Sequence, residues 1–94
     1  GKNNMFKLES CERITGTFNN IKTDWDRYNI ETKTPYSTKE YSVTIDMIKG
    51  EIKGDCIKYG SQYDLEKEDC IELLNAVFSS KTSNKPLRDF KHLI

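Results

Sequence analysis

Residues 12–27, with the sequence ERITGTFNNIKTDWDR, decide the fold of this 94-residue chain. If Asn19-Asn20 forms a two-residue turn, the flanking segments pair so that apolar residues face apolar ones and opposite charges meet. The facing residues are Phe18 and Ile21, Gly16 and Thr23, Ile14 and Trp25, Arg13 and Asp26, and Glu12 and Arg27. A slip of one residue would turn each apolar set to the other face, so this register is strongly specified and predicts a β-hairpin.

A second hairpin is predicted around Lys49-Gly50. Residues 41–48 alternate apolar and polar side chains, as a half-buried strand does. Residues 51–59 form its partner strand, which ends at Gly60-Ser61. With Lys49-Gly50 as the turn, the facing residues are Met47 and Ile52, Ile45 and Gly54, Val43 and Cys56, and Asp46 and Lys53.

The first strand, residues 5–18, alternates less regularly, and its polar middle predicts a bulge or a partly exposed stretch near residues 10–12. Residues 21–33 return as the second strand. The segment from Thr34 to Ser37 then forms a turn led by Pro35.

Asp64 is the expected N-cap of a helix whose first turns are acidic. Its apolar stripe consists of Cys70, Ile71, Leu74, Val77 and Phe78. Ser79 to Pro86 reads as a polar loop. Leu87, Phe90, Leu93 and Ile94 recur at helical spacing, which predicts a second, shorter helix or turn.

The expected fold is therefore α+β: a four-stranded antiparallel β-meander packed against a C-terminal amphipathic helix plus a short terminal helix, in two layers. Residues 1–94 form one small domain, with residues 1–4 read as a disordered end or a tag remnant. A small barrel plugged by the helix is the alternative architecture.

Composition excludes more functions than it indicates. The 15 Lys plus Arg balance the 15 Asp plus Glu, so no overall field attracts nucleic acid or a membrane. Cys11, Cys56 and Cys70 show no metal-site or disulfide spacing, and we expect Cys56 and Cys70 to be small core residues. His92 is the only histidine. No nucleotide, metal or catalytic motif is present, so we expect no cofactor and no enzymatic activity. With no signal peptide or membrane span, the expected location is the cytoplasm.

Two groups of residues are candidates for partner binding. Residues 64–80 carry five acids against Lys67 alone, and Glu66, Asp69 and Glu72 are the acids expected to face a partner. The ordinary interpretation of such a helix is a solvated face. If the helix covers Trp25, then Tyr28 and Ile30 lie on the outer sheet face, and Tyr36 lies in the turn beside Pro35. Burial of Tyr28 and Ile30, by a different register or by closure of the sheet into a barrel, is an equally ranked alternative.

The preferred function is a small protein-binding module, an inhibitor or accessory factor of a larger protein or nucleoprotein complex, of the kind that phages and mobile elements encode. Its acidic surface would meet a basic partner surface, such as a nucleic-acid groove, by charge mimicry. The alternative is a single-stranded nucleic-acid binder, because the order of four antiparallel strands and a helix resembles that of the Whirly and PUR-repeat families. Lysines interleaved with acids weaken that alternative. A homodimer through an open sheet edge is a further possibility.

Overall fold

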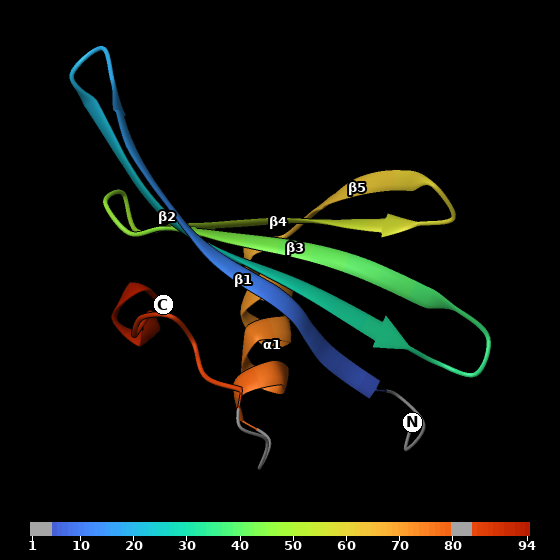
Figure 1. Ribbon diagram of the computed structural model, residues 1–94. Coiled ribbons are helices and arrows are strands. Elements are labelled where there is room, and N and C mark those ends of the chain that lie inside the picture. The colour runs from blue at the N-terminus through green and yellow to red at the C-terminus, as the bar shows by residue number, and fades with distance from the viewer. Residues whose placement is uncertain (1–4, 80–83) are drawn as a thin grey trace.

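A five-stranded antiparallel sheet carries one α-helix on one of its faces (Figure 1). The computed structural model describes residues 5–79 and 84–94, so the expectations for residues 1–4 and for residues 80–83 of the polar loop lie outside the described residues. The elements are β1 (Met5–Phe18), β2 (Ile21–Lys33), β3 (Thr38–Asp46), β4 (Glu51–Lys58), β5 (Ser61–Leu65), α1 (Lys67–Phe78) and a 3₁₀ turn, η1 (Lys91–Leu93). The strands lie in chain order, which confirms the antiparallel meander and the α+β class. In this order β1 and β5 are the edges of an open sheet, so the barrel alternative is wrong.

The first hairpin has the predicted register. Phe18 pairs with Ile21, and the pairing continues without interruption back to Ser10. Asn19 and Asn20 take φ values of 50° and 65°, the left-handed conformation that a two-residue hairpin turn requires. Asparagine tolerates this conformation better than most residues because its short side chain bonds locally.

A bulge at Glu9 changes which side chains of β1 share a face. Leu8 pairs with Ile30 and Ser10 pairs with Asn29, which leaves Glu9 as the extra residue. The bulge was predicted one residue later in the chain. Because a bulge shifts the alternation by one, Leu8 lies on the helix side of the sheet, whereas Ile14 lies on the opposite side.

The second hairpin differs from its predicted register by two residues. Ile45 pairs with Ile52 and Asp46 with Glu51, so residues 47–50 form a longer loop. The cause is Asp46, whose Oδ1 accepts hydrogen bonds from the backbone N–H groups of Ile48 (3.0 Å) and Lys49 (2.9 Å). Such side-chain to backbone bonds favour a wider turn over a two-residue one. A shift of two residues keeps every side chain on its expected face.

The fifth strand was not predicted. Tyr59 and Gly60, at φ values of 54° and 78°, form a two-residue turn, and the chain returns as β5. Asp64, expected to cap the helix, belongs to this strand. The residue that precedes α1 is Glu66, which makes no side-chain capping hydrogen bond. The sequence does not distinguish the end of β4 from a turn into β5, because a glycine such as Gly60 marks a strand end and a hairpin turn equally well.

The core lies between α1 and the sheet face that carries Tyr28 and Ile30, whose exposed fractions are 0% and 1%. The expected position of these two residues on the outer face is therefore wrong. The helix covers the face opposite Trp25, because the register places Tyr28 opposite Val43 and Ile45 opposite Ile52 and so gathers the larger apolar set there. The hydroxyl of Tyr28 accepts a hydrogen bond from the backbone N–H of Leu87 at 2.8 Å. Cys56 and Cys70 are buried, as predicted. The core residues are Tyr28, Ile30, Val43, Ile45, Ile52, Cys70, Leu73, Leu74, Val77 and Phe90.

The C-terminal segment, residues 84–94, packs beside α1 on the same side of the sheet (Figure 1). Phe90 is buried, with its ring centroid 6.2 Å from that of Phe78. Arg88 donates hydrogen bonds to the carboxylates of Asp24 and Asp26. The predicted terminal helix is only the short turn η1, and the segment is held by these side chains.

Candidate functional site

The sheet face turned away from α1 forms the candidate site, and we call it the open face. Figure 1 shows α1 and the C-terminal segment together on the other side of the sheet. In β2, Arg27, Asn29 and Glu31 alternate with the buried Tyr28 and Ile30, so they point to the open face.

Acidic residues stand directly opposite one another on the open face. The cross-strand partners are Glu31 and Glu40, Asp46 and Glu51, and Asp55 and Asp64. Like charges in directly opposite positions destabilise a sheet. Each of the three strand pairs from β2 to β5 contains one such pair, so the sheet holds these carboxylates against a local energetic cost.

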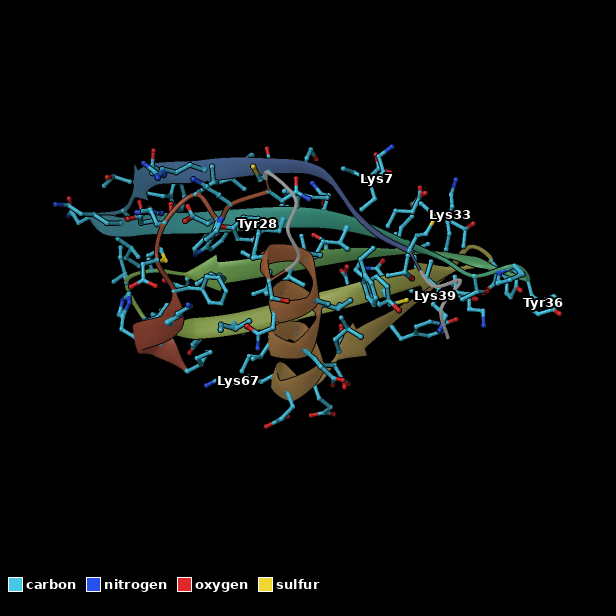
Figure 2. All side chains as sticks on the ribbon, turned by 90° about the horizontal axis from the view of Figure 1, so that it is seen from below. Lys7, Tyr28, Lys33, Tyr36, Lys39 and Lys67 are labelled. Carbon is cyan, nitrogen blue, oxygen red and sulfur yellow. The ribbon has the colours of Figure 1, made fainter. Side chains whose placement is uncertain are left out.

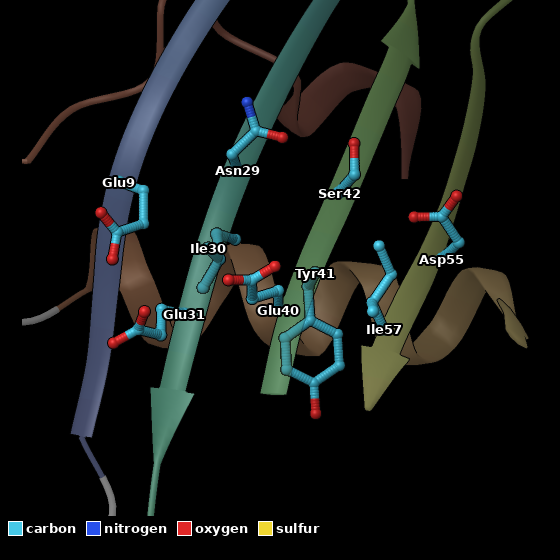
Figure 3. Close-up of a pocket in the computed structure, with 9 residues that line it drawn as sticks. All are labelled: Glu9, Asn29, Ile30, Glu31, Glu40, Tyr41, Ser42, Asp55 and Ile57. Carbon is cyan, nitrogen blue, oxygen red and sulfur yellow. The ribbon is translucent and has the colours of Figure 1, made fainter. Parts of the chain in front are cut away.

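Four carboxylates line a shallow hollow of about 380 Å³ on the open face, which we call the acidic hollow (Figure 3). They belong to Glu9, Glu31, Glu40 and Asp55, which come from four adjacent strands. The bulge is what presents Glu9, and the other three occupy regular positions. The remaining lining residues are Asn29, Ile30, Tyr41, Ser42 and Ile57.

Basic and amide groups compensate part of this charge. Lys33 lies 3.4 Å from Glu31, Lys7 lies 3.9 Å from Glu9, and the Nε2 of Gln62 donates to Asp55 at 2.6 Å. Within residues 5–79 and 84–94, Glu40 forms no ion pair. It is exposed and stands opposite another acid, so Glu40 is the least compensated carboxylate of the hollow.

The acidic hollow is not arranged as a metal site. Among the residues that the structure describes, no three His, Cys, Asp or Glu side chains lie close enough together to hold a metal ion. Metal binding needs several oxygen ligands that converge on one point. The carboxylates instead lie on separate strands (Figure 3), an arrangement that suits several separate cationic groups.

The rest of the open face carries Trp25, which is half-buried beside Arg27, Lys49 and Lys53. Trp25 stands opposite Asp46. Burial by itself would raise the pKa of Asp46, but the hydrogen bonds from the backbone N–H groups of Lys49 and Ile48, together with the neighbouring Trp25 side chain, lower that pKa below its ordinary value. The carboxylate of Asp46 is therefore a structural anion of the turn.

The structure does not bring the residues predicted for partner binding together. Tyr28 and Ile30 are buried beneath α1, so their side chains are not at a surface. Tyr36 is 92% exposed in the turn between β2 and β3. The acids Glu66, Asp69 and Glu72 are exposed as predicted, but Asp69 and Glu72 belong to α1, on the side of the sheet opposite the acidic hollow.

The acidic hollow is the feature that sequence reasoning missed. In the sequence, Glu31, Glu40 and Asp55 are acids interleaved with dispersed lysines. The opposition of Glu31 and Glu40 appears only when β2 is paired with β3 in the correct register, and that of Asp55 and Asp64 only when β4 is paired with β5. The signal that could have found them is the alternation of β3, which puts Glu40 and Ser42 on the face opposite Tyr41 and Val43.

Comparison with known proteins gives no match: no family model fits the chain, and no curated protein or solved structure is significantly similar to it. Within the described residues, no helix has the length and apolar character needed to cross a membrane.

Proposed function

We propose that the protein is a non-enzymatic protein-binding module, an inhibitor or accessory factor, whose open face binds a basic surface of a larger protein. The observation that supports the proposal most directly is the pairing of Glu31 with Glu40 at the centre of the acidic hollow. A sheet face that contacts only solvent gains stability when opposite charges face each other across its strands. Local violations of such a rule occur chiefly at functional sites.

Charge complementarity supports a basic protein surface as the partner. Lysine or arginine side chains of a partner would neutralise the opposed carboxylates and remove their repulsion, so binding relieves an unfavourable term in the free protein. Phosphate groups would add to that repulsion, which disfavours a nucleic-acid ligand at this face. A basic groove that normally holds nucleic acid is the partner surface that several separate carboxylates fit best.

The test is a titration of the ¹⁵N-labelled protein, followed by amide shifts, with two probes: an oligoarginine peptide and a single-stranded oligonucleotide. We expect the peptide to shift amides around Glu31, Glu40 and Asp55 at low salt, with affinity that falls as salt rises. Glu40→Gln should weaken this binding. Glu68→Gln, which removes the same charge from the exposed side of α1, is the matched control and should leave binding unchanged.

The same variant gives a second readout that needs no partner. Glu40→Gln should raise the free energy of unfolding by about 0.2–1 kcal/mol, because it ends the repulsion across β2 and β3. Lower stability for this variant would remove the argument from like-charge pairing. Shifts on the open face with the oligonucleotide, and none with the peptide, would favour the nucleic-acid alternative.

A further inference from the structure

A second exposed surface lies on the helix side of the sheet, where α1 does not reach. Figure 2 shows α1 crossing the middle of the sheet, while the end with Lys33, Tyr36 and Lys39 extends beyond it. This end holds the turn between β2 and β3 and the beginning of β1. The side chains on this part of the helix-side face therefore pack on the sheet alone and are not covered by α1.

A groove runs along this uncovered end beside α1, and we call it the helix-side groove. Its part next to the helix has a volume of about 370 Å³ and is lined by Phe6, Tyr41, Leu65, Asp69, Glu72, Leu73 and Ala76. A smaller hollow of about 190 Å³ shares Phe6 and Tyr41 with it and continues toward Ser37 and Lys39. The floor is apolar, and Phe6 in it is 46% exposed. The groove is large enough to hold apolar side chains of a partner.

The two ends of the groove carry opposite charges. Asp69 and Glu72 lie one turn apart on α1, both are exposed, and neither forms an ion pair with the other described residues. Lys39 lies at the far end, again without an ion pair in the described part of the chain. An apolar floor between an acidic end and a basic end is complementary to a peptide segment with an apolar centre. Such a segment would carry a basic residue that meets the acidic end and an acidic residue that meets the basic end.

We propose that the helix-side groove binds a short segment of another protein that contains an apolar anchor, a Lys or Arg on one side of it and an Asp or Glu on the other. The anchor would cover Phe6 and Leu73, the cation would meet Asp69 and Glu72, and the anion would meet Lys39. A lipid headgroup or nucleic-acid phosphate would be repelled by the acidic end. The groove lies on the face opposite the acidic hollow, so this proposal does not depend on the function proposed above.

The experiment is a selection of a random linear-peptide display library against the full chain. The expected result is enrichment of peptides with an apolar centre, a basic residue on one side and an acidic residue on the other. Ala76→Phe places a large ring in the groove and should abolish binding of the enriched peptides. Glu72→Lys should weaken their binding by about two- to fivefold or more, in line with the loss of an exposed ion pair.

Glu68→Lys is the matched control, because Glu68 is an exposed acid of α1 outside the groove lining, and it should leave binding unchanged. A charge swap guards against misfolded variants: Glu72→Lys should bind better to peptides in which the basic residue is replaced by an acidic one. No enrichment, enrichment of peptides without an apolar centre, or equal binding by Ala76→Phe that unfolds like the wild type would overturn the proposal. So would a dimer in sedimentation that Ala76→Phe abolishes, because the occupant would then be a second copy.

Discussion

Arg88 binds the carboxylate of Asp26 with two hydrogen bonds, from Nη2 to Oδ1 at 2.6 Å and from Nε to Oδ2 at 3.0 Å. The two residues are 62 positions apart, and the side chain of Asp26 is only 1% exposed. Arg13, the partner predicted for Asp26, contributes a longer contact of 3.6 Å. The planar guanidinium can bond Asp24 and Asp26 at once, so it fixes the C-terminal segment to β2.

Arg88→Met should therefore destabilise the fold, because it leaves the buried Asp26 with Arg13 as its only cation among the described residues. We expect a loss of about 1.5–3 kcal/mol in urea unfolding, the range for a hydrogen bond to a charged group. Arg88→Lys keeps the charge but not the fork, and should recover only part of the loss. A wild-type stability for Arg88→Met would mean that the C-terminal segment is held by Phe90 and Leu87 alone.

Stability at acid pH should depend on Asp24. Hydrogen bonding from Arg88 holds the pKa of Asp24 below its ordinary value of 3.8. A carboxylate whose pKa is lower in the folded state binds protons more readily when unfolded, so its contribution is present above pH 3.8 and is lost as the pH falls through the folded value. The melting temperatures of wild type and Asp24→Asn should therefore converge below pH 3.8. A difference that stayed constant with pH would show that the ion pair adds no pH-dependent stability.

Gly54 allows α1 to approach β4 closely. A Cβ atom at this position would lie 2.7 Å from Sγ of Cys70 and 2.9 Å from the carbonyl oxygen of Ser42. Gly54→Ala should therefore lower the free energy of unfolding by about 1–3 kcal/mol, as overpacking of a core does. Gly16→Ala is the control, because its Cβ would meet only Oγ1 of Thr23 at an ordinary 3.6 Å. Equal effects of the two variants in chemical denaturation would contradict this account.

Tyr59 occupies a backbone conformation that suits another residue better. Its φ of 54° lies in the left-handed region, which costs a non-glycine residue about 1–2 kcal/mol, and its ring is exposed. Tyr59→Gly should raise the melting temperature, since the loss of the contact between its ring and Nζ of Lys58 at 5.2 Å is the smaller effect. Gly60→Ala, at φ 78° with open space around it, should lower the melting temperature. Backbone strain at Tyr59 therefore predicts that the two variants change the melting temperature in opposite directions.

Short-range pairing was predictable from the sequence, and the assignment of faces was not. The first hairpin follows from Asn19-Asn20, because a two-residue turn fixes its register. The placement of Tyr28 on the outer face is wrong because it depended on which sheet face α1 covers. Each face carries one aromatic residue of β2, so the sequence does not indicate which face the helix covers. The register of the second hairpin failed because the carboxylate of Asp46 forms the turn, which alternation alone does not reveal.

The candidate site was less predictable than the fold for a related reason. The opposition of Glu31 and Glu40 depends on the turn between β2 and β3, where Oγ1 of Thr34 accepts hydrogen bonds from the N–H groups of Tyr36 and Ser37. The sequence predicts that turn, but it does not predict which residues of β2 and β3 face each other beyond it. The exposed acids of α1 were identified correctly from the first-turn pattern, because that pattern is local.

The bulge at Glu9 also affects how the molecule behaves in concentrated solution. As an edge strand of 14 residues, β1 would be a long template for another strand, and such edges promote aggregation. The extra residue breaks that template into residues 5–8 and 10–18, so a strand from a second molecule cannot pair along its whole length without a matching irregularity. Deletion of Glu9 would leave Leu8 opposite Ile30 and Ser10 opposite Asn29 but restore a continuous edge, and the resulting chain should associate into strand-paired aggregates.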